Sequence, residues 1–97
     1  MTFDFKRQVV LITGAAAGLG YACAQAFAAA GAKLVITDIS QEALDKAVND
    51  LEKGGTEVLG LLNDASDSAD VSAMMAAIVA RFGRLDIAVN NAGTATP

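Results

Sequence analysis

Hydrophobic residues alternate along the chain between short continuous runs and longer stretches with helical spacing. Continuous runs occupy residues 8–13 (QVVLIT), 33–38 (KLVITD), 57–63 (EVLGLLN) and 85–90 (LDIAVN). Short apolar runs that are rich in β-branched residues and bounded by turn residues are typical of strands buried on both faces. The pattern therefore predicts four buried strands.

The three stretches between these runs predict amphipathic helices. The stripe of the first helix, residues 18–30, is predicted to contain Leu19, Ala22, Cys23, Ala26, Phe27 and Ala30. The stripe of the second, which Ser40 is expected to cap, contains Leu44, Ala47, Val48 and Leu51. The stripe of the third, which begins at Ser66 or Ser68, contains Val71, Met74, Met75, Ile78, Val79 and Phe82. Cys23 and both methionines are thus interpreted as core residues, and Gly31, Gly54-Gly55 and Gly83 as helix ends.

The order of these elements, β-α-β-α-β-α-β, indicates an α/β fold with a doubly wound parallel sheet. The first three strands are expected to step one way across the sheet and the fourth to return beside the first, in the order 3-2-1-4. Right-handed crossovers then place the third helix on the face opposite the first two. The fourth strand is expected to form an exposed apolar edge, which favours self-pairing or aggregation.

Three glycines stand between the first strand and the first helix, in the stretch TGAAAGLG. In a doubly wound sheet this turn binds the pyrophosphate of a dinucleotide. Gly14 would allow the sharp turn, Gly18 the close approach of backbone to phosphate, and Gly20 the close packing of helix on strand. A tight turn without a ligand is the alternative. The stretch lacks the G-K-[ST] ending of a P-loop, which argues against a nucleoside triphosphatase.

Polar residues follow the other three strands, where ligands of such sheets bind. Asp38 can accept hydrogen bonds from the ribose hydroxyls of NAD and would repel the 2′-phosphate of NADP. Ala17 and Ile39 stand where a basic residue would reverse that preference. Asp64 can accept from the adenine amino group, and Asn90-Asn91 follow the fourth strand. The alternatives are a loop aspartate before the Ser40 cap, a helix-capping aspartate and an asparagine turn, respectively.

Composition excludes several other classes of function. The 97-residue chain has a net charge of −4 and no basic run, which argues against nucleic-acid and anionic-membrane binding. One cysteine permits no internal disulfide and fits a reducing compartment, and a chain without histidine has few ligands for zinc. Neither a signal peptide nor an apolar stretch of about 20 residues is evident, so a cytoplasmic protein is expected.

These motifs together resemble those of the short-chain dehydrogenase/reductase family. Residues 13–20 resemble its T-G-x-x-x-G-x-G motif, residues 90–93 its N-N-A-G motif, and Asp38 and Asp64 its ribose- and adenine-binding acids. The resemblance implies a Rossmann-like fold, of which residues 1–97 form the N-terminal portion, with NAD as the preferred cofactor. It places the cofactor contacts on Gly14, Ala16, Ala17, Gly18, Leu19, Asp38, Ile39, Asp64, Ala65, Asn90, Ala92 and Gly93.

The resemblance also implies hydride transfer between nicotinamide and an alcohol or carbonyl, with catalysis by a Ser, a Tyr-x-x-x-Lys pair and an Asn. The only tyrosine is Tyr21, and the residue four positions later is Gln25 rather than lysine. The catalytic residues are therefore expected beyond residue 97, and the chain alone is expected to be inactive. A homo-oligomer is possible for the full-length protein.

Two further interpretations stay open. A non-catalytic dinucleotide-binding fragment or degenerate module would use the same loop and the same acids. A methyltransferase-like Rossmann fold is disfavoured, because Asp38, Asp64 and N-N-A-G together fit the dinucleotide family better.

Overall fold

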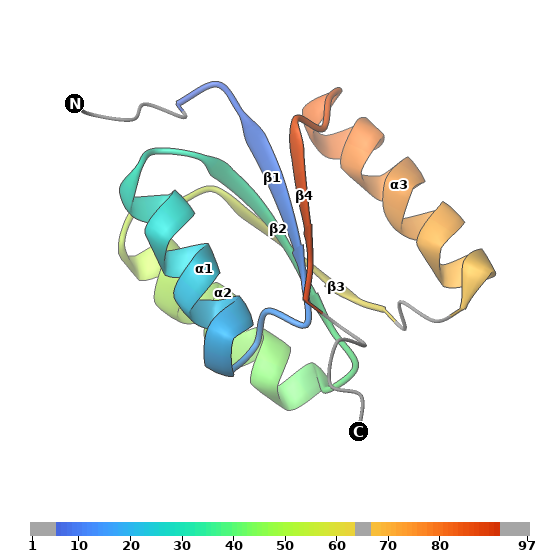
Figure 1. Ribbon diagram of the computed structural model, residues 1–97, viewed down its shortest axis with the longest axis horizontal. Coiled ribbons are helices and arrows are strands. Elements are labelled where there is room, and N and C mark those ends of the chain that lie inside the picture. Colours follow the sequence, from blue (N-terminus) through green and yellow to red (C-terminus); the bar gives the residue numbers. More distant parts are fainter. Residues whose placement is uncertain (1–5, 64–66, 92–97) are drawn as a thin grey trace.

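Strands and helices alternate throughout the part of the chain that the structure describes, residues 6–63 and 67–91 of a computed structural model. Figure 1 shows the elements, which in chain order are β1 (Val9–Thr13), α1 (Gly18–Ala29), β2 (Lys33–Asp38), α2 (Gln41–Lys53), β3 (Val58–Leu62), α3 (Ser68–Phe82) and β4 (Ile87–Asn90). Each predicted element is present, and its ends differ from the prediction by two residues at most.

The strands form one parallel sheet in the order β3-β2-β1-β4. In its register Thr13 pairs with Thr37 of β2 and with Asn90 of β4, and Asp38 pairs with Leu62 of β3. The predicted α/β class and strand order are both confirmed. Because the strands are parallel, their carboxyl ends meet at a single edge.

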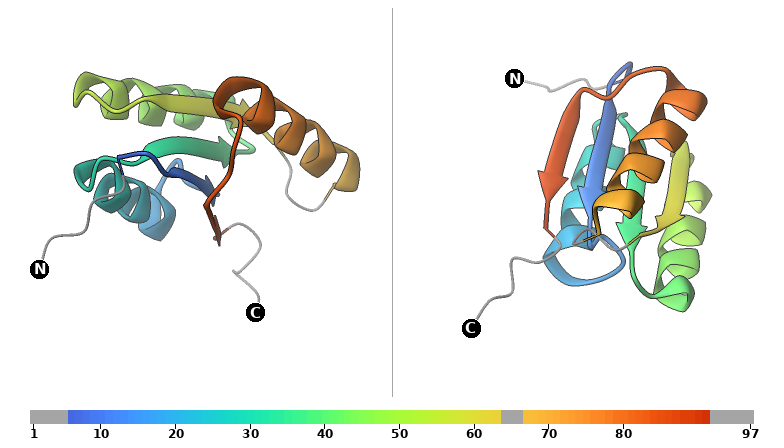
Figure 2. Two further views of the ribbon diagram at one scale, coloured as in Figure 1. Left: turned by 90° about the horizontal axis from the view of Figure 1, so that it is seen from above. Right: turned by 90° about the vertical axis from the view of Figure 1, so that its right-hand side faces the viewer.

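The helices cover the two faces of the sheet unequally, with α1 and α2 on one face and α3 on the other (Figure 2). Successive strand residues point to opposite faces. Val10 and Ile12 accordingly pack in a cluster with Leu44 of α2, whereas Val9 and Leu11 pack in a second cluster with Met74 and Ile78 of α3. The predicted placement of the third helix is confirmed.

The predicted apolar stripe of α1 is partly wrong. Leu19 is 84% exposed, and Ala22 and Ala26 are also exposed. The buried residues are instead Gly20 and Ala24, with Cys23, Phe27 and Ala28 packed against the core. The helix is rich in small apolar residues on every side, so the apolar pattern could not identify the buried face.

One detail of α3 also differs from the prediction. Met75 and Val79 are exposed, so the buried stripe is narrower than expected, although Met74 and Ile78 are core residues. The N-cap is Asp67, whose carboxylate accepts from the backbone N–H groups of Ala69 and Asp70. The helix begins at Ser68, one of the two predicted starts, and Ser66 lies outside the described residues.

Ser40 caps α2 as predicted, and Leu44, Ala47 and Leu51 are buried. Within the described ranges, no helix is long and apolar enough to cross a membrane.

β4 pairs with β1 and lies at one edge of the described sheet. Ile87 and Val89 are half-buried against the α1–α2 face, while Ala88 and Asn90 are exposed on the other. The α3 cluster includes residues of β1, β2 and β3 and none of β4 among those described. The edge is therefore less uniformly apolar than predicted.

A carboxylate fastens the amino end of β4 to that of β1. Asp86 accepts a hydrogen bond from the backbone N–H of Val9 at 2.8 Å and donates its own N–H to the Val9 carbonyl at 3.0 Å. The Arg84 guanidinium donates to the same carboxylate at 2.9 Å. The hydrogen bonds from Arg84 make the largest contribution to lowering the pKa of the Asp86 carboxyl below its ordinary value, and the hydrogen bond from the Val9 N–H makes the next largest.

We predict that Asp86→Asn weakens the pH dependence of folding stability in acid. Because the folded-state pKa of Asp86 is lowered, its contribution is complete above the unfolded pKa of about 3.9 and is lost as pH falls through the folded value. The melting temperature of the unmodified chain should therefore fall more steeply than that of the variant between about pH 5 and pH 2.5.

Thermal unfolding followed by circular dichroism measures this difference. Asp50→Asn, an exposed position on α2, is the matched control and should follow the unmodified chain. Parallel curves for Asp86→Asn and the unmodified chain would contradict the prediction.

Candidate functional site

Three of the four predicted cofactor segments meet at the carboxyl edge of the sheet. The glycine loop follows Thr13, Asp38 ends β2 and Asn90 ends β4, and the parallel register places these positions side by side. The remaining predicted contacts, Asp64, Ala65, Ala92 and Gly93, lie outside the described residues. This edge is where doubly wound sheets bind their ligands.

The glycines of the loop have separate structural requirements. Gly14 and Gly18 have φ angles of 62° and 61°, a left-handed conformation that favours glycine. A Cβ on Gly20 would overlap the Gly14 carbonyl oxygen and lie 2.8 Å from Asn91 Nδ2. A Cβ on Gly18 would meet no atom of the described residues within 4 Å, so these residues leave the space beside Gly18 open.

The amino end of α1 faces this open space without a side-chain cap. Ala17 occupies the N-cap position with extended backbone, and the first turn has no acidic residue. Backbone N–H groups at the start of a helix carry partial positive charge and bind anions. Leu19 and Ile39 are 84% and 76% exposed, so each has surface that a ligand could cover.

Asp38 connects three segments of the edge. Its Oδ2 accepts from the backbone N–H of Ala16 at 3.2 Å, and its Oδ1 from that of Ser40 at 3.1 Å. Its backbone carbonyl accepts from the N–H of Asn63 at 3.0 Å, at the end of β3. Asp38 thus contacts the glycine loop, the start of α2 and the segment that leads to Asp64.

The other end of the loop is bonded to β4 and the residue after it. The Thr13 hydroxyl donates to Asn90 Oδ1 at 3.1 Å and accepts from the backbone N–H of Asn91 at 3.0 Å. Asn91 Nδ2 donates to the Gly14 carbonyl at 3.1 Å. Asn91 therefore holds the glycine loop in place, whereas Asn90 is exposed at the carboxyl edge of the sheet.

Thr13 is not among the predicted cofactor contacts, although it begins the stretch TGAAAGLG. Thr13 is only 6% exposed, and its hydroxyl hydrogen-bonds to Asn90 and Asn91, which joins the loop to the end of β4. The sequence signal for this role is that Thr13 is a polar residue at the end of an otherwise apolar strand.

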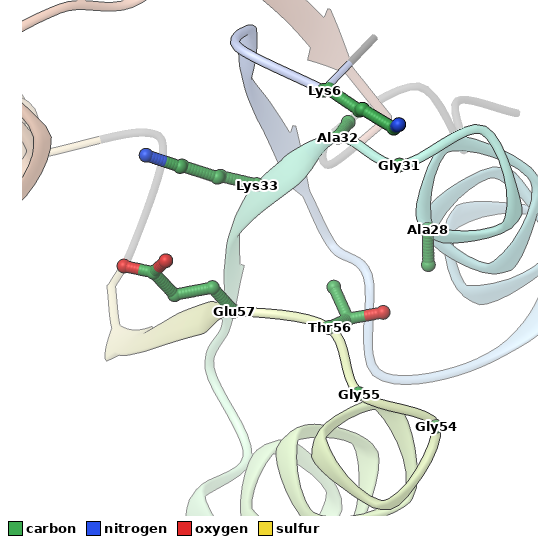
Figure 3. Close-up of a pocket in the computed structure, with 9 residues that line it drawn as sticks. All are labelled: Lys6, Ala28, Gly31, Ala32, Lys33, Gly54, Gly55, Thr56 and Glu57. Carbon is green, nitrogen blue, oxygen red and sulfur yellow. The ribbon is translucent and has the colours of Figure 1, made fainter. Parts of the chain in front are cut away.

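Among the described residues, one cavity lies at the carboxyl ends of the strands and another at their amino ends. One of ≈ 200 Å³ is bounded by the ends of β1 and β4 and by Val71 and Met74 of α3, next to Asn90. The other, of ≈ 240 Å³, lies at the opposite edge, among residues that begin the strands or end α1 and α2, including Gly31, Gly54 and Thr56 (Figure 3). Its lining combines two helix carboxyl ends and Glu57, which repel anions, with Lys6 and Lys33, which attract them.

Comparison with known proteins identifies the family. The sequence profile described as "short chain dehydrogenase" matches residues 8–97. The chain belongs to the short-chain dehydrogenase/reductase family. This assignment confirms the resemblance in the motifs.

Curated members of the family are longer than this chain. An uncharacterized oxidoreductase, YxjF of Bacillus subtilis, is 40% identical over 88 residues, which are 91% of this chain and 34% of that protein. Meso-2,3-butanediol dehydrogenase of Serratia marcescens is 43% identical over 93 residues, 96% of this chain and 36% of that protein. The chain thus spans about a third of the length of these relatives.

Solved structures of family members share the fold. L-Sorbose reductase of Gluconobacter frateurii, complexed with NADPH and L-sorbose, superimposes with a TM-score of 0.93 at 36% sequence identity. The superposition covers 99% of this chain and 37% of the reductase chain. A family member from Burkholderia phymatum, in complex with NAD, superimposes with a TM-score of 0.84 at 38% sequence identity. The superposition covers 91% of this chain and 31% of the Burkholderia chain. Both nicotinamide dinucleotides therefore occur among the structural neighbours.

We predict that Gly20→Ala destabilises the chain by about 1–3 kcal/mol, the usual cost of overpacking. The added methyl group would meet the Gly14 carbonyl, which is backbone and cannot rotate away as a side chain does. Urea unfolding followed by circular dichroism measures the change.

Gly54→Ala is the matched control, because its Cβ would meet its nearest atom at an ordinary 3.5 Å. We expect Gly54→Ala to stay within about 0.5 kcal/mol of the unmodified chain. Equal stabilities for the two variants would show that the contact between α1 and the loop is not tight.

Proposed function

We propose that this chain is the cofactor-binding part of an oxidoreductase that transfers hydride between a nicotinamide dinucleotide and an alcohol or carbonyl, and that it prefers NAD. Hydride chemistry is what the nicotinamide supplies when bound. The residues of this chain would bind and orient the cofactor. The observation that carries the proposal is the uncapped amino end of α1 beside the Asp38 carboxylate.

The loop suits a pyrophosphate by its shape and its charge. In the part of the chain that the structure describes, no side-chain oxygen caps the first turn of α1, and space is open beside Gly18. Phosphate oxygens would accept hydrogen bonds from the backbone N–H groups that donate to a capping side chain in other helices. Backbone at Gly14, Ala16, Ala17, Gly18 and Leu19 would line the phosphates.

Asp38 supports NAD over NADP. A carboxylate can accept hydrogen bonds from both ribose hydroxyls, whereas a 2′-phosphate at the same place would face a like charge. The neighbouring residue is Ile39 rather than a lysine or arginine that would offset this repulsion. The adenine would lie toward Asp64 and Ala65, and the nicotinamide toward Asn90, Ala92 and Gly93.

The substrate class rests on the family relationship. The relatives named above include a diol dehydrogenase and a sugar reductase, and both names describe alcohol–carbonyl chemistry. We propose that a catalytic Ser and Tyr-x-x-x-Lys follow residue 97 in the complete protein. A reading frame without them would instead favour a non-catalytic dinucleotide-binding module.

We predict saturable binding of NADH to the folded chain, with Asp38→Ala binding NADH about 10- to 100-fold more weakly. This range corresponds to the loss of a hydrogen bond to a charged group, about 1.5–3 kcal/mol. The ratio of the dissociation constants for NADPH and NADH should also fall. Cofactor fluorescence, with folding checked by circular dichroism, measures both.

Asp50→Ala removes a carboxylate from an exposed position on α2 and should leave both affinities unchanged. Absence of saturable NADH binding to a folded sample would refute the cofactor site. Unchanged selectivity in Asp38→Ala would refute the role of Asp38 in choosing NAD.

A further inference from the structure

The Asp38 carboxylate is already hydrogen-bonded before any ribose reaches it. One oxygen accepts from Ala16 in the glycine loop at 3.2 Å, and the other from Ser40 at the start of α2 at 3.1 Å. The two donors belong to segments separated by the whole of α1 and β2. The side chain therefore bridges the turn that would hold the phosphates and the turn that would hold the ribose.

Within residues 6–63 and 67–91, one further backbone hydrogen bond attaches the loop to β2. The Ala15 N–H donates to the Thr37 carbonyl at 3.0 Å, and beyond Ala16 the chain reaches Ala17, which is exposed. Gly14 and Gly18 flank the segment with left-handed φ angles. Glycine is the most conformationally free residue, so a segment between two glycines needs external contacts to stay ordered.

We propose that Asp38 is a positioning residue for the glycine loop as well as the residue that selects the ribose. Its hydrogen bond to Ala16 holds the loop in the conformation that exposes the amino end of α1. Removing the carboxylate then does two things, since it relieves repulsion of a 2′-phosphate and also releases the loop that must bind the pyrophosphate. The part of this inference that concerns cofactor choice rests on the proposed function.

Amide hydrogen exchange in the cofactor-free chain tests the positioning role directly. In Asp38→Ala, exchange at the Ala16 amide should accelerate at least about tenfold, while Leu11 and Ile36 in the buried strands keep their protection. Asp50→Ala is the control and should leave Ala16 unchanged. Unchanged exchange at Ala16 in Asp38→Ala, or equal loss of protection at Leu11 and Ile36, would overturn the proposal.

Asp38→Asn provides a second test in a side chain of the same size. An amide has one acceptor oxygen, so it cannot use two oxygens for the two N–H donors as the carboxylate does. Exchange should therefore accelerate at Ala16 or at Ser40. Full protection at both amides would contradict the proposal.

Titration with NADP⁺ then connects the loop to cofactor choice. Both variants lack the charge of Asp38. Where hydrogen exchange shows that the one acceptor of Asp38→Asn stays with Ala16, this variant should bind NADP⁺ more tightly than Asp38→Ala. Equal or tighter binding by Asp38→Ala would show that the loop contact adds nothing to affinity. Failure of the unmodified chain to bind NAD⁺ would refute the proposed function and leave the exchange result standing.

Discussion

The parallel pairing of β1 with strands on both of its sides is the constraint on which the structure depends. All five residues of β1 are buried, and its register with β2 and β4 brings Thr13, Thr37 and Asn90 to one level. The candidate site follows from this alignment, because the loops after β1, β2 and β4 then open at one edge of the sheet. The Asp86 contacts align the strands at the other edge.

Close backbone approach is the second requirement, and it explains the composition of the loop. α1 can start beside the end of β1 because Gly20 has no side chain to meet the Gly14 carbonyl and Asn91. Asn91 and Thr13 then satisfy the polar groups that this close packing encloses. The same arrangement leaves the amino end of α1 without a side-chain cap, which suits it to a ligand that is itself an anion.

The sequence predicted the fold well, because strand and helix patterns alternate regularly and their order limits the topology. It failed on the buried face of α1, where alanine on every side gives no contrast. For the site, it identified Asp38 from its place after a strand. It could not show that this carboxylate also binds Ala16, because that contact joins residues 22 positions apart through the folded sheet.

The central claim is that the carboxyl edge of the sheet binds a nicotinamide dinucleotide. Backbone amide chemical shifts recorded during titration with NAD⁺ test it most directly, since they report on each edge of the sheet in one experiment. Saturable changes should appear at Gly18, Leu19 and Ile39, while Gly54 and Gly55 at the opposite edge stay unchanged. Changes confined to Gly54 and Gly55, or none in a folded chain, would contradict the account.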